Sequence, residues 1–179
     1  MKNPLFTLCF VLTGLLLVTS CEKWKDQPPK DLGLTNKYCN IQQAINYNHG
    51  YPGIEDNSTC ILPSNPFAGT YAYSDTILIG EDTLFPAPIT FTIQVKDTFG
   101  FAINNFCGNA NQLIFKADKY YRASVADSVV GKGTQLMCRS VDTLSGTVEF
   151  RKSDSSLALE FKVLSDTGIS THKGRAYKK

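Results

Sequence analysis

The 179-residue sequence has few of the residues and spacings on which common enzyme chemistry depends. It contains only two histidines, His49 and His172, and we expect both to be exposed surface residues. No segment resembles the nucleophile elbow of serine hydrolases. The stretch 131–134, Gly-Lys-Gly-Thr, lacks P-loop spacing and is expected to form a hairpin turn. We therefore predict that the protein is not an enzyme and needs no cofactor.

A strong charge of one sign is also absent. Lys and Arg number 18 against 16 Asp and Glu, which gives a formal net charge of +2. Nucleic-acid binding depends largely on neutralising phosphates with basic side chains, so this balance gives no electrostatic reason to expect such a partner. The basic C-terminus, with His172, Lys173, Arg175 and the pair Lys178 and Lys179, is interpreted as a solvated strand end.

Long apolar runs are confined to the N-terminus. Residues 1–4 carry one positive charge, and residues 5–18 are almost wholly apolar. This run is shorter than the roughly 20 residues that a membrane-spanning helix needs, so residues 1–20 are interpreted as a cleaved signal peptide. The leader ends in Val18-Thr19-Ser20-Cys21.

These four residues resemble the lipobox of bacterial prolipoproteins, although Val18 stands where leucine is commonest. The resemblance implies cleavage before Cys21 and attachment of a diacylglycerol to its sulfur, usually with N-acylation. Two or three acyl chains give stable anchoring. We therefore expect a lipid-anchored protein of the bacterial cell envelope, at the outer membrane. The alternative is an ordinary secretory leader that leaves Cys21 free for a disulfide.

Four cysteines remain beyond the leader and Cys21: Cys39, Cys60, Cys107 and Cys138. An even number in an exported chain favours two disulfides. Three pairings are possible. The pairs Cys39–Cys60 and Cys107–Cys138 are favoured because each closes a loop within one apparent unit. A four-cysteine zinc site is the rival, but the sequence contains no CxxC pair, so we predict no metal site.

The composition divides the exported chain into three parts. Residues 21–36 are polar, contain Pro28-Pro29 and are interpreted as a lipidated tether, in which Trp24 either lies in the membrane interface or is exposed without a role. Residues 37–63 form a cysteine-bounded loop, and residues 65–179 form a β-domain.

The cysteine-bounded loop resembles a small motif of exported proteins in some Gram-negative bacteria: a cysteine, Ala-x-Asn-Tyr-Asn, a turn, and Asp-x-Ser-x-Cys. The resemblance implies a compact loop closed by a disulfide and implies no catalysis. The matching residues are Ala44, Asn46, Tyr47, Asn48, Asp56, Ser58 and Cys60. Glu55, Asp56 and Asn57 suggest a calcium site, but their spacing is not that of an EF-hand, and local Asx-turn capping is favoured. The glycosylation pattern at 57–59 is interpreted as incidental.

From residue 65 onward the pattern indicates β-strands. Apolar and polar residues alternate over 89–96, 144–151 and 157–163, which is typical of strands with one buried face. The remaining strands are expected near 69–73, 76–79, 99–101, 113–116, 120–122 and 169–177. Seven or eight short strands without a helical period predict an all-β fold, either a small antiparallel barrel or a sandwich. The segment 67–71 and the terminal meander resemble small lipocalin-like lipoproteins.

Three functions stay open at this level. The first is a binding module for a small apolar ligand or an envelope protein, with a pocket that Phe91, Phe99, Phe101, Phe115 and Tyr121 would line unless they simply pack the core. The second is a structural envelope protein without a ligand, and the third is a hydrolase with an unrecognised site. An internal cavity would favour the first, and a filled core with an exposed apolar patch the second. A serine–histidine contact in a cleft would favour the third.

Several aspartates precede Ser or Thr and an aliphatic residue, as in the O-glycosylation signal of some exported bacterial proteins. The matches begin at Asp75, Asp82, Asp127 and Asp142. We expect these acids, and Asp97, to lie in turns.

Overall fold

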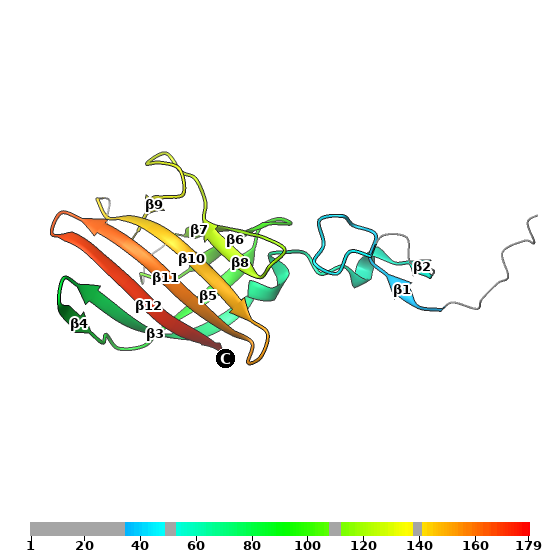
Figure 1. Cartoon of the computed structure of the whole chain (residues 1–179), viewed down its shortest axis with the longest axis horizontal. Helices are drawn as coiled ribbons and strands as arrows, with labels where there is room; N and C mark the ends of the chain where they lie inside the picture. The colour runs from blue at the N-terminus through cyan, green and yellow to red at the C-terminus, as the bar shows by residue number, and fades with distance from the viewer. Residues whose placement is uncertain (1–34, 49–52, 108–111, 138–140) are drawn as a thin grey trace, which may run out of the picture. The chain divides into compact units, whose positions relative to one another are not determined.

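The alternation of apolar and polar residues along the second half of the chain produces a sheet that closes on itself. A computed structural model describes residues 35–48, 53–107, 112–137 and 141–179. Almost all of these lie in one unit, Asn36–Lys179. The described part is β-structure with two short 3-10 helices, so the predicted all-β class is confirmed (Figure 1).

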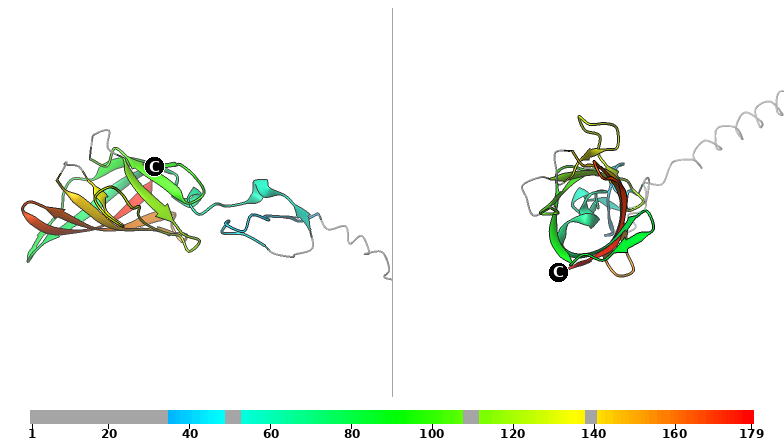
Figure 2. Two further views of the ribbon diagram at one scale, coloured as in Figure 1. Left: turned by 90° about the horizontal axis from the view of Figure 1, so that it is seen from above. Right: turned by 90° about the vertical axis from the view of Figure 1, so that its left-hand side faces the viewer.

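Eight strands form a closed antiparallel barrel, which confirms the barrel and excludes the sandwich. Strands that are neighbours in sequence are neighbours in the barrel, and the last strand pairs with the first. Figure 2 shows the barrel end-on as a ring. The strands are β3 (Gly69–Ile79), β5 (Ile89–Val95), β6 (Gly100–Asn104), β7 (Leu113–Ala117), β8 (Arg122–Val125), β10 (Thr143–Arg151), β11 (Ser156–Ser165) and β12 (Gly168–Lys178).

Two short strands extend the barrel at one end. Strand β4 (Asp82–Leu84) folds back on β3, and β9 (Gln135–Leu136) pairs with the start of β10. The predicted separate strands at 69–73 and 76–79 are in fact one continuous strand, β3. This strand is long because its second half leaves β5 and pairs with β4 while β12 continues along its other side.

Aromatic side chains fill the barrel. Successive residues of a strand point to opposite faces, and the inward set packs into one cluster. Phe101 stacks on Phe115 with ring centroids 5.5 Å apart, and Phe115 meets Phe161 at 5.8 Å. All three side chains are fully buried. Pairs of this kind contribute about 0.5–1.5 kcal/mol beyond their buried area, so the interior is a packed core.

The helix η3 (Asn65–Phe67) closes the end of the barrel at which β3 begins. Phe67 is fully buried and stacks on Phe101 with centroids 4.8 Å apart. Ser64, just before η3, fixes the helix to the β5–β6 turn: its backbone N–H donates to Thr98 O and its hydroxyl to Asp97 O. Because Phe67 occupies this end, a ligand would have to enter at the other one.

The segment that precedes the barrel is closed by a disulfide between Cys39 and Cys60, which confirms this predicted pair. Within it, β1 (Lys37–Tyr38) runs parallel to β2 (Ile54–Glu55) and is followed by η2 (Asn57–Thr59). Cys107 is also disulfide-bonded, whereas its predicted partner Cys138 lies outside the described residues. The leader, Cys21, the tether and His49 lie outside the described residues as well.

Candidate functional site

The two ends of the barrel differ in their apolar exposure. We call the end that carries the β3–β4 and β11–β12 hairpin tips the open end, and the end with the turns 96–99, 118–121 and 152–155 the basal end (Figure 1). Strand β3 begins at the basal end, so the chain reaches the barrel from there. Most of the exposed large apolar side chains lie at the open end.

The two hairpin tips hold an apolar cluster, which we call the open-end surface. Leu164 pairs with Ile169 on one hairpin, and Leu84 pairs with Ile77 on the other. The hairpins are adjacent because β12 and β3 are paired up to Thr171 and Leu78. The surface consists of Leu78, Ile79, Leu84, Phe85, Leu164 and Ile169, with Phe85 77% exposed. Exposed apolar side chains gathered on adjacent loops can serve as an interaction site on a soluble domain.

The charges at the two ends are also unequal. The described residues of the open-end loops include more acids than bases. The acids are Glu81, Asp82, Asp127, Asp142 and Asp166, and the base is Lys132. The basal turns and the end of β12 carry more bases than acids. These residues are Lys96, Lys119, Lys152, Lys178 and Lys179 against Asp97, Asp118 and Asp154. The open end is therefore acidic and apolar, and the basal end is basic.

Four polar side chains meet just inside the open end. His172 Nδ1 lies 2.7 Å from Asp75 Oδ2, and its Nε2 lies 3.1 Å from Ser170 Oγ. The Tyr73 hydroxyl donates to the other carboxylate oxygen, Asp75 Oδ1, at 2.8 Å. The side chains of His172 and Asp75 are only 12% and 11% exposed. We call these residues the polar cluster.

Strand parity and one glycine place the polar cluster inside the barrel. Tyr73 and Asp75 are two residues apart on β3 and share the inward face, as Ser170 and His172 do on β12. Asp75 pairs with Gly174, which has no side chain to occupy the space between them. A Cβ on Gly174 would lie 2.5 Å from the Tyr73 ring and 2.2 Å from Ser74 O. Glycine is therefore needed here for Tyr73 to reach Asp75.

The hydrogen bonds define the roles of the cluster's atoms. A carboxylate only accepts, so Asp75 accepts hydrogen bonds from the Tyr73 hydroxyl and from Nδ1–H of His172. In the neutral imidazole with its proton on Nδ1, Nε2 accepts the hydrogen bond of the Ser170 hydroxyl. Burial, with a smaller effect from the bond to Asp75, raises the pKa of Tyr73 far above its ordinary value. Tyr73 therefore stays a neutral donor.

A small cavity of about 140 Å³ adjoins the polar cluster. Tyr73, Asp75 and His172 form its polar side. Its apolar wall is formed by Pro86, Ala87, Ile89, Phe106 and Met137. Pockets for drug-sized ligands are usually about 300–1,000 Å³, so this cavity takes at most a short group.

A larger groove of about 540 Å³ crosses the outer face of the barrel, away from the polar cluster. Two of its charged side chains pair with each other, and a third pairs with an acid outside the groove. Lys173 Nζ lies 3.0 Å from Glu160, and Arg175 lies 3.8 Å from Asp154. Exposed pairs of this kind contribute little, and no ligand chemistry follows from them. We regard the groove as a solvated surface.

The filled core decides between the two interpretations of the aromatic side chains. Phe91, Phe101 and Phe115 are fully buried and pack against other core rings, as the core-packing interpretation predicts. Phe99 lies in the β5–β6 turn. Tyr121 adopts φ 64° in the β7–β8 turn and stacks on Phe150.

Two predictions about residues of the polar cluster were wrong. His172 was expected to be an exposed strand-end residue, but it lies on the inward face of β12. Asp75 was expected in a turn, but it lies in the middle of β3. The chain between them forms the barrel, and closure of β12 onto β3 brings them together.

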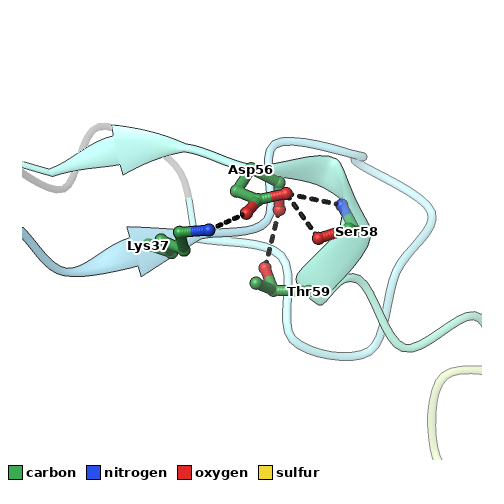
Figure 3. A network of polar contacts seen from close by, with 4 residues as sticks. All are labelled: Lys37, Asp56, Ser58 and Thr59. Atoms are coloured by element: carbon green, nitrogen blue, oxygen red, sulfur yellow. Dashed lines mark hydrogen bonds and ion pairs between the residues drawn. The ribbon is translucent and has the colours of Figure 1, made fainter.

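The polar side chains of the cysteine-bounded loop bind one another, as Asx-turn capping predicts. Asp56 caps η2: its Oδ1 accepts from the Ser58 amide at 3.0 Å and from the Ser58 hydroxyl at 2.6 Å. Lys37 Nζ lies 2.8 Å from Asp56 Oδ2 (Figure 3). These bonds, that to Lys37 foremost, lower the pKa of Asp56 to about 2. Asn57 donates to Glu55, so the three suggested calcium ligands are engaged locally.

The hydrogen bonds of the Asn46 side chain account for the amide at this position of the Ala-x-Asn-Tyr-Asn motif. Its Nδ2 donates to Thr59 O at 2.7 Å, and its Oδ1 accepts from the Ile61 amide at 2.8 Å. The side chain thus joins the two halves of the loop beside the disulfide, and Ala44 is buried next to it. In the part of the chain that the structure describes, no three His, Cys, Asp or Glu residues gather as metal ligands would.

Comparison of the chain with family models, with curated proteins and with solved structures found no match. Across the described ranges, no helix has the length and hydropathy to span a membrane.

Proposed function

We propose that this protein is a lipid-anchored protein of the bacterial envelope that binds a protein partner through the open-end surface. The observation that carries the proposal is the apolar cluster on two adjacent hairpin tips of a barrel whose interior is filled. A filled barrel offers no room for a large apolar ligand, whereas burial of an exposed apolar cluster against a partner lowers the free energy.

The charge distribution supports a protein partner at the open end and an orientation of the barrel with its basal end toward the membrane. Anionic headgroups attract the basic basal end, where the chain enters the barrel from the tether and Cys21. The acidic loops of the open end are repelled by the same surface and complement a partner with a basic rim. In this proposal the open-end surface, at the opposite end of the barrel from the basal end, is the part that contacts a partner.

Site-specific photo-crosslinking of the full chain in its own membrane tests this proposal. A photoreactive phenylalanine analogue replaces Phe85, which is 77% exposed at the open end, or Tyr120, which is 82% exposed at the basal end. We expect a discrete protein adduct from position 85 and none from position 120. The substitution Leu84→Asp should abolish the adduct. Equal adducts from both positions, or adducts to lipid only at position 85, would contradict the proposal.

The anchor is tested separately by intact-mass analysis of the protein purified from the membrane fraction. A chain that begins at Cys21 and carries acyl mass is the expected result. A chain that keeps residues 1–20, or one that starts at Cys21 without acyl mass, would remove the lipid from the proposal and leave the open-end surface to be judged by crosslinking alone.

A further inference from the structure

We propose that Ser170 is an acyl-accepting nucleophile and that His172 and Asp75 form with it a hydrolytic site for short-chain carboxylic esters. The geometry is that of a nucleophile, a base and an orienting acid in one hydrogen-bonded series: 3.1 Å from Ser170 Oγ to His172 Nε2, and 2.7 Å from His172 Nδ1 to Asp75 Oδ2. The proposal departs from the expectation of a protein without enzymatic activity.

The directions of the hydrogen bonds suit base catalysis. Asp75 holds the proton of His172 on Nδ1, which leaves the Nε2 lone pair directed to the serine hydroxyl. Tyr73 occupies the second carboxylate oxygen and fixes the orientation of Asp75. Asp75 and Tyr73 are positioning residues, because they act through the imidazole. The arrangement is recognised by geometry and roles, and the order of the three residues along the chain does not matter.

The neighbouring cavity is lined by His172 and Asp75 but not by Ser170, so it limits the size of the group that can lie beside the imidazole. Its wall of Pro86, Ile89, Phe106 and Met137 is apolar, and its polar end is His172 with Asp75. A volume of about 140 Å³ suits a short acyl group and excludes a long chain. The cavity lies at the open end, whereas Phe67 closes the basal end.

The reaction balances without an oxidant or a metal. Ser170 Oγ attacks the ester carbonyl carbon, and the hydroxyl proton passes to His172 Nε2. The bond from the carbonyl carbon to the alcohol oxygen breaks, and His172 returns the proton to the departing alcohol. Water then attacks the acyl-serine by the same proton path, which releases the carboxylic acid and restores Ser170.

Covalent labelling of the full chain in detergent micelles tests the nucleophile directly. The probe is a short alkyl fluorophosphonate, which loses fluoride when a serine oxygen attacks phosphorus, and the readout is the mass of the labelled peptide. We expect one label on Ser170 and none in Ser170→Ala. His172→Gln should lower the labelling rate about 100-fold, because a positioned base contributes roughly 10²–10⁴-fold.

Ser165→Ala is the matched control, since Ser165 is the last residue of β11 and its hydroxyl bonds Thr167 and Gly168 across the neighbouring turn. Its labelling rate should stay within twofold of that of the parent chain. Asp75→Asn should lower the labelling rate of folded protein, and Asp75→Glu should restore part of it, an effect that loss of packing alone would not produce.

The proposal is overturned if folded protein carries no label on Ser170, or if His172→Gln labels at the parent rate. Circular dichroism of each variant shows whether it has folded. Should His172→Gln fail to fold, the Ser170→Ala comparison decides, because that change removes a single oxygen. None of these outcomes depends on the partner proposed for the open-end surface.

Discussion

His172 Nδ1 lies 2.7 Å from Asp75 Oδ2, although 97 positions separate the two residues in the sequence. They belong to β12 and β3, the last and first strands of the barrel, which pair only when the barrel closes. The polar cluster is therefore assembled by closure and stands beside the open-end surface, which the same two strands carry at their tips. The paired strands β3 and β12 thus carry both the polar cluster and part of the open-end surface.

The two buried tyrosines of β3 should respond oppositely to the loss of their hydroxyls. Tyr71 OH has no hydrogen-bond partner among the described residues, and burial raises the pKa of Tyr71 to about 12. Tyr71→Phe removes an unsatisfied buried group and should stabilise the protein by about 1 kcal/mol. Tyr73→Phe deprives the Asp75 carboxylate of a donor and should cost about 1.5–3 kcal/mol. Urea unfolding of the two variants measures this difference, and equal effects would contradict it.

Gly146 should tolerate no side chain, because β10 lies too close to β11 at this point. Its φ is 150°, and an added Cβ would lie 2.2 Å from Glu160 O and 2.8 Å from Phe161 Cα. Both contacts are with backbone atoms, so neither can be relieved by rotating a side chain. Gly146→Ala should destabilise the barrel by more than about 1 kcal/mol.

Gly168 is the matched control for this substitution. It also has a positive φ, 125°, but nothing lies within 4 Å of an added Cβ. Gly168→Ala should therefore show the conformational cost without the clash. Thermal unfolding of both variants checks the prediction, and a loss of stability at Gly168 equal to that at Gly146 would contradict it.

The strands were largely predictable from the sequence, because alternation over 144–151 and 157–163 identifies them and their inner faces. The choice between barrel and sandwich was not predictable, since the pairing of β12 with β3 is a contact between the two ends of the domain. The polar cluster was missed for the same reason. One signal was present: His172 shares strand parity with Ala176, and Asp75 shares it with Tyr73. Polar residues in inward positions were interpreted as exposed because they lie near strand ends or beside turn-forming residues.

The disulfide between Cys39 and Cys60 should stabilise its own loop more than the barrel. The two cysteines are 21 residues apart, for which the chain-entropy account gives about 3 kcal/mol. In the double variant Cys39→Ala, Cys60→Ala, amide hydrogen exchange should accelerate within 39–60. The amides of β11 and β12 should keep their protection, because their bonds lie within the barrel. Equal loss of protection in both regions would show that the loop supports the barrel.

The ion pair between Lys37 and Asp56 should make the stability of the cysteine-bounded loop fall at acid pH and stay constant from about pH 4 to neutral pH. The pKa of Asp56 is lowered from 3.8 to about 2, first by Lys37 and then by Ser58. A lowered pKa means that the folded loop favours the ionised carboxylate. The resulting stabilisation is fully present above pH 3.8 and is lost as the pH falls toward 2.

Carbon-13 titration of the Asp56 carboxyl by NMR measures its pKa. Lys37→Met should raise it toward 3.8, whereas Lys173→Met, which removes an exposed pair with Glu160 on the barrel, should leave it unchanged. An Asp56 that titrates near 3.8 in the parent chain would mean that Lys37 and Ser58 do not hold it in solution.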